Sequence, residues 1–206
     1  MKKIFLVINI FCVITLSAQE IKFYGEAIPG GLMIGVGEKI ISAKLNETNL
    51  QVSKSGVFVF GFDRNANGKF ILRVQFKKKK IKTFEYNLEK REYEKQSLSL
   101  EKKYVTTPKK LSARIKREAQ MMKTARAKVG KVKDALFMNG FVYPVDSINI
   151  TGVFGSQRIL NGKPGNIHNG TDFNAEEGDS VYAITDGIVR IAGKDFFYNG
   201  NFILLD

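Results

Sequence analysis

The one histidine of the chain lies four residues before an aspartate, in the run His168-Asn-Gly-Thr-Asp172. An imidazole and a carboxylate at this spacing can share one metal ion from a turn that leads into a strand. Gly170 argues against a helix between them and lets the backbone fold tightly. The alternative interpretation is a surface turn in which the two side chains are only hydrogen-bonded.

The composition also limits which catalytic or metal sites the chain can form. The 206 residues contain one cysteine, Cys12, which excludes a disulfide framework and a cysteine-rich zinc module. A Ser-His-Asp triad or a metal site built on histidine would therefore depend on His168 alone.

Further motifs surround this run in a fixed order: Gly152-Val-Phe-Gly-Ser-Gln-Arg158, then His168 to Phe173, then Glu177-Gly-Asp-Ser-Val-Tyr-Ala183 and Asp186-Gly-Ile-Val189. Together they resemble the LytM/lysostaphin-type zinc metallopeptidases, which cut peptide cross-bridges in bacterial peptidoglycan. The resemblance covers residues 141–206. It implies that this part is the N-terminal portion of an antiparallel β-sheet metallopeptidase domain.

The resemblance also assigns roles to residues. The histidine and aspartate of the family's H-x-x-x-D motif are zinc ligands, which implies that His168 and Asp172 bind Zn²⁺. In that family the ion activates a water molecule that attacks the peptide carbonyl. Arg158 is a candidate substrate-binding residue in the groove, with a surface ion pair as its alternative interpretation.

The chain departs from this family in one important respect. The family's third zinc ligand and its catalytic base are histidines of an H-x-H motif and of a preceding Tyr-x-His-Leu-like segment, and this sequence contains neither. We therefore expect the 206 residues to be an N-terminal fragment of a longer enzyme, inactive as they stand, with an incomplete sheet that exposes an apolar edge. The alternative is a non-catalytic protein that binds the wall or activates other wall hydrolases.

The elements that must position these residues are mainly β-strands. Residues 19–88 contain short β-prone runs separated by turns, which predicts a small Ig-like β-sandwich. The first of these runs span 31–36, 39–43, 56–60 and 69–76. The four lysines at 77–80 then separate 69–76 from a last run at 81–88, which predicts a solvated hairpin tip. Further β-prone runs at 142–144, 148–152, 181–184, 187–192 and 201–205 predict the strands of the C-terminal part.

A basic helical linker is predicted over residues 89–134. Residues 77–133 carry 20 Lys and Arg against 6 Asp and Glu, within a chain of net charge +13. Pro108 and Gly130 bracket a predicted helix from Lys109 to Val129. Its apolar stripe favours a connector that packs on a neighbouring domain, with electrostatic contact to an anionic wall polymer or lipid as a second role; no nucleic acid partner is expected. The stripe consists of Leu111, Ile115, Ala119, Met122 and Val129.

The first residues are typical of a signal peptide. A basic start at Lys2 and Lys3 precedes an apolar run from Ile4 to Leu16, and small residues follow at 17–18. The alternative, a membrane anchor, needs roughly 20 apolar residues. We therefore expect residues 1–18 to be removed and the protein to be exported to the periplasm or cell envelope.

Overall fold

The computed structural model describes residues 20–99, 109–128 and 130–206. These residues form a mainly β protein with several antiparallel sheets, which confirms the predicted fold class at that level. The predicted signal peptide, Pro108 and Val129 lie outside the described residues. Within the described residues, no helix is both long and apolar enough to span a membrane.

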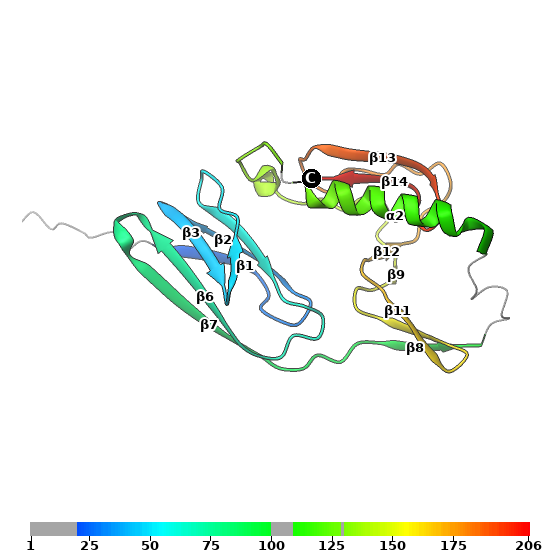
Figure 1. The fold of residues 1–206 in the computed structure, drawn as a ribbon, viewed down its shortest axis with the longest axis horizontal. Coiled ribbons are helices and arrows are strands. Elements are labelled where there is room, and N and C mark those ends of the chain that lie inside the picture. The colour runs from blue at the N-terminus through cyan, green and yellow to red at the C-terminus, as the bar shows by residue number, and fades with distance from the viewer. Residues whose placement is uncertain (1–19, 100–108, 129) are drawn as a thin grey trace, which may run out of the picture.

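The N-terminal part consists of two antiparallel sheets (Figure 1). The first sheet has the order β1-β2-β5, and the second has the order β4-β3-β6-β7. The strands are β1 (Ile21–Gly25), β2 (Leu32–Gly37), β3 (Ile40–Leu45), β4 (Thr48–Leu50), β5 (Val57–Gly61), β6 (Gly68–Phe76) and β7 (Ile81–Leu88). Strands β2, β3, β5, β6 and β7 match the predicted runs, whereas β1 and β4 were not predicted.

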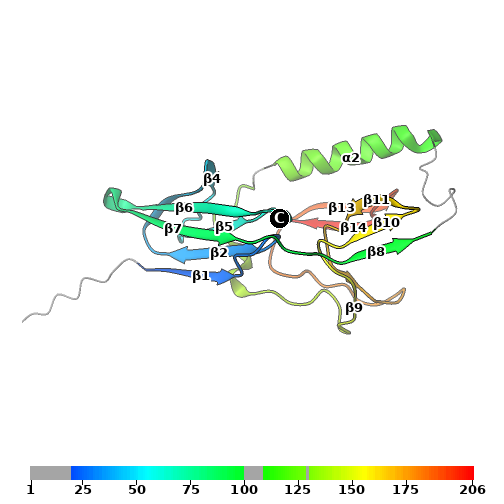
Figure 2. The same cartoon turned by 90° about the horizontal axis from the view of Figure 1, so that it is seen from below.

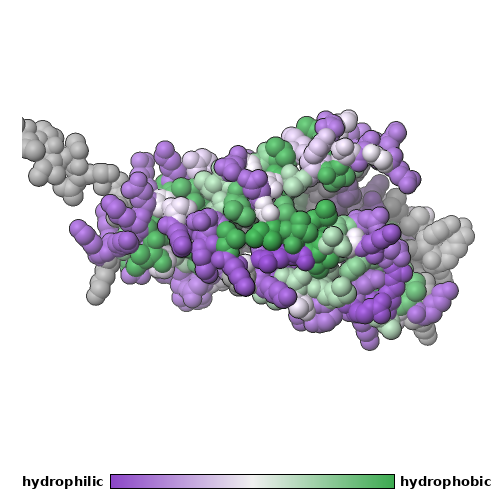
Figure 3. All heavy atoms as spheres, turned by 90° about the horizontal axis from the view of Figure 1, so that it is seen from above, coloured by the Kyte–Doolittle hydropathy of each residue, from purple (hydrophilic) through white to green (hydrophobic). Residues whose placement is uncertain are grey.

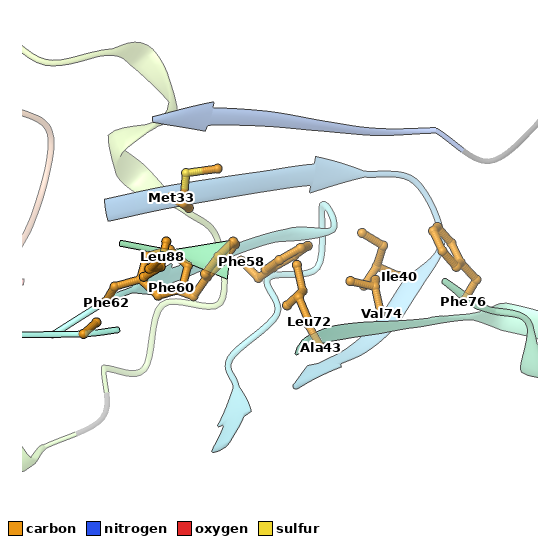
Figure 4. Packing of buried hydrophobic residues seen from close by; sticks show 11 residues of the cluster. Met33, Ile40, Ala43, Phe58, Phe60, Phe62, Leu72, Val74, Phe76 and Leu88 are labelled. Atoms are coloured by element: carbon orange, nitrogen blue, oxygen red, sulfur yellow. The ribbon is translucent and has the colours of Figure 1, made fainter. Parts of the chain in front are cut away.

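Side chains from both sheets meet in one hydrophobic core (Figure 4). Along β6, Leu72, Val74 and Phe76 are buried while Arg73 is exposed, which is the alternation of a strand with one covered face. Phe58 of β5 is 1% exposed, and its ring occupies the space where a side chain on Gly35 would lie. This core holds the two sheets together.

The lysines at 77–80 form the connection between β6 and β7, as predicted. A short 3-10 turn, Lys77–Lys79, bridges the two strands, and Lys78 adopts a left-handed backbone conformation with a φ of 70°. The described side chains of this turn are exposed to solvent. The hairpin-tip interpretation is therefore confirmed.

The basic segment contains a strand as well as the predicted helix. Strand β8 (Lys95–Leu98), which was not predicted, pairs in parallel with β10 of the C-terminal part. The helix consists of a 3-10 turn, Lys109–Leu111, followed by α2 (Ser112–Ala127). It has no fully buried residue, and it lies against β13 at the surface (Figure 2).

The predicted apolar stripe is confirmed only in part. Leu111, Ile115 and Met122 are half-buried, but Ala119 is exposed. Glu118 lies on the covered face instead, where its carboxylate accepts a hydrogen bond from the Phe197 amide at 2.8 Å. A charged side chain therefore contributes to the contact that the sequence assigned to apolar residues alone.

Three small sheets make up the C-terminal part, in contrast to the single antiparallel sheet that the sequence predicted. Their orders are β11-β10-β8, β12-β9 and β13-β14, and the pairing of β8 with β10 is parallel. The strands are β9 (Ile150–Gly152), β10 (Gln157–Leu160), β11 (Lys163–Ile167), β12 (Asp172–Phe173), β13 (Val189–Phe196) and β14 (Gly200–Leu205). These strands are short and their antiparallel pairings contain register shifts, so they do not continue into one sheet.

Three of the predicted C-terminal runs correspond to β9, β13 and β14. The runs at 142–144 and 181–184 are not β-strands in the structure, but they lie side by side. The Val142 amide donates to the Ile184 carbonyl at 2.8 Å, and the Tyr182 amide donates to the Pro144 carbonyl at 2.9 Å. Exposed apolar side chains occur on the β13–β14 ribbon, where Val189 is 55% and Ile203 is 68% exposed.

Candidate metal centre

The structure brings His168 and Asp172 into contact. His168 follows β11, and Asp172 begins β12, so the residues between them form the turn that leads into a strand. The Nε2 atom of His168 lies 3.2 Å from Oδ1 of Asp172. His168 is half-buried and Asp172 is exposed, so the pair faces solvent from one side.

A backbone carbonyl orients the His168 ring. Nδ1 lies 3.1 Å from the carbonyl oxygen of Val153. Because a carbonyl only accepts hydrogen bonds, we assign the proton to Nδ1, and in the neutral ring this leaves the lone pair of Nε2 directed at the Asp172 carboxylate. Two acceptors at this distance repel each other unless the ring is protonated or a cation lies between them.

The separation of the two atoms suits two ligands of one zinc ion. Zinc binds histidine nitrogen and carboxylate oxygen at about 2.1 Å in tetrahedral geometry, which places neighbouring ligand atoms roughly 3.4 Å apart. The observed 3.2 Å between Nε2 and Oδ1 is close to that value. A hydrogen bond from the second ring nitrogen to a carbonyl is also the usual support of a metal-binding histidine.

Gly152 makes room for the carboxylate. It lies opposite Asp172 in the pairing of β9 with β12. A Cβ atom at Gly152 would lie 2.6 Å from Oδ2 of Asp172, which is closer than any real contact of that kind. Gly170, by contrast, has no left-handed backbone, and a Cβ there would meet only Nε2 of His168, at 3.9 Å. The turn therefore does not need the glycine that the sequence analysis singled out.

The loop 153–156 holds the backbone of His168. The amide of Gly155 donates to the carbonyl of His168 at 2.8 Å, and the amide of His168 donates to the carbonyl of Ser156 at 2.9 Å. The Ser156 hydroxyl donates to the Val153 carbonyl at 2.9 Å. Both the ring and the main chain of His168 are thus fixed by one loop.

A cavity of about 1000 Å³ opens beside the pair. Arg158 of β10 lies on its wall together with His168 and Asp172, so the structure brings all three predicted site residues to one place. Arg158 is exposed, and among the residues that the structure describes it makes no ion pair. Strand β8 supplies Lys95 and Gln96 to the same wall.

The described residues do not complete a zinc ligand set. No group of three His, Cys, Asp or Glu side chains that could hold a metal ion occurs within residues 20–99, 109–128 and 130–206. The pair therefore fits two positions of a tetrahedral ion, and further ligands would have to come from elsewhere.

A second cavity, of about 670 Å³, lies between β5 and the C-terminal part. Its wall is largely apolar and includes Phe58, Leu136, Ile184 and Leu205, and it contains no histidine. Figure 3 shows hydrophobic side chains gathered near the middle of the molecule, with hydrophilic side chains toward the ends. This cavity brings together none of the residues that the sequence analysis assigned to a site.

No protein-family model matches this chain, and no curated protein does. The assignment of the site therefore depends on the local contacts of His168 and Asp172. The contribution of β8 to the cavity was missed because its four residues adjoin a strongly charged stretch and pair with a strand far away in the sequence.

Proposed function

We propose that the protein is a zinc-dependent endopeptidase of the LytM/lysostaphin type, which hydrolyses peptide cross-bridges of bacterial peptidoglycan. The observation that supports this most is the pairing of His168 Nε2 with Asp172 Oδ1 at 3.2 Å while Nδ1 is held by the Val153 carbonyl. A carbonyl-oriented histidine beside a carboxylate occurs in catalytic zinc sites, which use three protein ligands.

Each residue of the site has a role in this proposal. His168 and Asp172 would hold the ion, which supplies Lewis-acid chemistry by lowering the pKa of water and polarising a carbonyl. Val153 keeps the ring tautomer that leaves Nε2 free to bind. Arg158 would bind a carboxylate of the peptide, because its guanidinium is exposed on the cavity wall and without an ion pair among the described residues.

The other parts of the chain have supporting roles in the proposal. The two N-terminal sheets would form an Ig-like sandwich, and residues 1–18 would direct export to the periplasm or cell envelope. Residues 89–134 would contact an anionic wall polymer or lipid through their excess of lysine and arginine.

A second candidate function is a non-catalytic protein that binds the wall or activates other hydrolases. The specific observation that favours it is the lack of a third candidate ligand near the pair within the described residues. Two protein ligands alone hold zinc weakly, whereas a binding protein needs no complete set.

Zinc content and wall cleavage, measured on the protein as its gene encodes it, test the proposal. We expect about one zinc per chain and release of new amino termini from purified peptidoglycan, with both lost in His168→Ala and Asp172→Ala. Asp146→Ala is the matched control, since this exposed carboxylate lies outside the cavity wall and, among the described residues, accepts one long hydrogen bond, from the Tyr182 hydroxyl at 3.3 Å.

The outcomes separate the two functions. Undiminished cleavage in His168→Ala would refute the zinc endopeptidase. A zinc-free protein that binds peptidoglycan without releasing amino termini would support the non-catalytic function.

A further inference from the structure

We infer that Arg64 and Tyr93 are positioning residues for His168, so that the N-terminal sheets control the geometry of the metal centre. This inference rests on the proposed zinc-binding role of His168. Arg64, Tyr93 and Arg91 pack together, and we call these three residues the clamp. The clamp contacts the N-terminal sheets on one side and the loop 153–156 on the other.

Tyr93 is anchored on the N-terminal sheets. Its hydroxyl donates to the carbonyl of Pro29 at 2.7 Å. The next residue, Gly30, donates its amide to the carbonyl of Phe62 at 3.1 Å, and Phe62 belongs to the hydrophobic core. The tyrosine is therefore tied to a turn that is itself tied to the core.

Arg64 joins this anchor to the C-terminal part. Its guanidinium carbon lies 4.2 Å from the centre of the Tyr93 ring, and Arg91 lies over the same ring at 4.9 Å. The Nε of Arg64 donates to the carbonyl of Gly155 at 2.7 Å. A charged donor stacked on an aromatic ring is a geometrically specific contact, which a flexible lysine would not reproduce.

Gly155 fits closely against the clamp. It is buried, its φ is 85°, and a Cβ atom there would lie 2.2 Å from two atoms of the Tyr93 ring. Phe154 approaches Gly30 in the same way, since a Cβ at Gly30 would lie 2.7 Å from its ring. The loop is thus pressed onto the N-terminal sheets at two neighbouring residues.

The same loop carries every described hydrogen bond that orients His168. The Gly155 amide and the Ser156 carbonyl bind its main chain, and the Val153 carbonyl binds its ring. Release of the clamp would therefore free the Val153 carbonyl from its place and let the His168 ring turn away from Asp172. The two side chains would then no longer present Nε2 and Oδ1 to one ion.

The hold of the loop on His168 can be measured by hydrogen exchange of two amides, because the His168 amide donates to the Ser156 carbonyl and the Gly155 amide donates to the His168 carbonyl. The experiment follows both amides by NMR in the metal-free protein. We expect slow exchange in the natural protein and exchange about tenfold faster or more in Arg64→Ala. We also expect zinc affinity to fall about 10-fold, as for the loss of other outer supports of a metal ligand.

Two further variants make the result specific. Tyr93→Leu should speed the exchange of these two amides as Arg64→Ala does, and the double variant should speed it no further, because both act through one clamp. Arg73→Ala is the control, since it removes an exposed arginine of β6 that lies in neither the clamp nor the cavity. Circular dichroism confirms that each variant is folded at the temperature of the measurement.

Unchanged exchange of the His168 and Gly155 amides in folded Arg64→Ala and Tyr93→Leu would overturn the inference. So would a change of equal size in Arg73→Ala. If the natural protein binds no zinc while the variants show the expected faster amide exchange, the clamp is supported and the proposed function is refuted, which keeps the two failures distinct.

Discussion

Replacement of Gly152 by alanine should damage the metal centre without damaging the fold. The new Cβ would lie 2.6 Å from Oδ2 of Asp172, whereas ordinary contacts of a Cβ atom begin at 3.4 Å. The carboxylate must therefore move by about 0.8 Å, several times the roughly 0.2 Å that zinc–ligand distances tolerate. Asp172 is exposed and can rotate toward solvent, which relieves the contacts with Oδ2 and Cγ. The remaining contact with its Cβ, at 3.2 Å, needs the strands to part by only about 0.2 Å, so most of the strain is relieved at the ligand.

The expected loss follows from removal of one ligand. Zinc affinity should fall by about 100-fold, equivalent to about 2.7 kcal/mol, while the free energy of unfolding changes by less than about 1 kcal/mol. A competition titration with a chromophoric chelator measures the first quantity, and urea unfolding of the metal-free protein measures the second.

Gly170→Ala is the matched control. It lies in the turn between the two ligands, but its Cβ would meet only Nε2 of His168, at an ordinary distance of 3.9 Å. Its zinc affinity should stay within about threefold of the natural protein, a difference below 1 kcal/mol. Equal zinc affinities in Gly152→Ala and the natural protein would refute the role of Asp172 as a ligand.

Three further perturbations test other parts of the structure. Phe58→Ala should lower the free energy of unfolding by about 3–5 kcal/mol in urea unfolding, because it empties the centre of the N-terminal core; a loss below 1 kcal/mol would contradict that placement. The pKa of Glu118 is lowered by its hydrogen bond with Arg114 and by the Phe197 amide, so the contact of α2 with Phe197 should be complete above pH 4.5 and lost as the pH falls through the lowered pKa. Hydrogen exchange of the Phe197 amide measures this, and Glu118→Gln should abolish the pH dependence. Binding to an anionic wall polymer should weaken at least tenfold between about 0.1 and 1 M salt, as screening shortens from about 10 to 3 Å, and salt-independent binding would exclude the basic segment.

Local patterns predicted the strands with the clearest alternation and turns. The β6–β7 hairpin follows from two alternating runs around the lysines at 77–80, and no distant contact is needed to define it. Strand β8 could not be predicted in this way, because its pairing with β10 joins residues about 60 positions apart in the sequence. The β10–β11 hairpin did have a local signal in Asn161-Gly162, whose φ values of 51° and 78° suit a two-residue turn.

The candidate site shows the same division between local and distant information. The contact of His168 with Asp172 follows from their spacing in the sequence, and Arg158 was placed beside them by motif order. The Val153 carbonyl could not be predicted, because a backbone group has no side-chain signature. Gly152 was visible as a glycine, but the position needs a glycine because the Asp172 carboxylate lies opposite it in β12.

The site is built on sheets that cannot be rigid by themselves. All buried hydrophobic side chains among the described residues lie between Met33 and Leu88, in the N-terminal part. The pair of His168 and Asp172 lies instead beside sheets of two and three strands, and two-stranded sheets are marginally stable in isolation. Precise placement of His168 and Asp172 therefore needs support from a part of the protein with its own hydrophobic core. The hydrogen bond from Arg64 to the Gly155 carbonyl supplies such support from the N-terminal sheets. On this argument, loosening the N-terminal core should weaken zinc binding before it unfolds the chain.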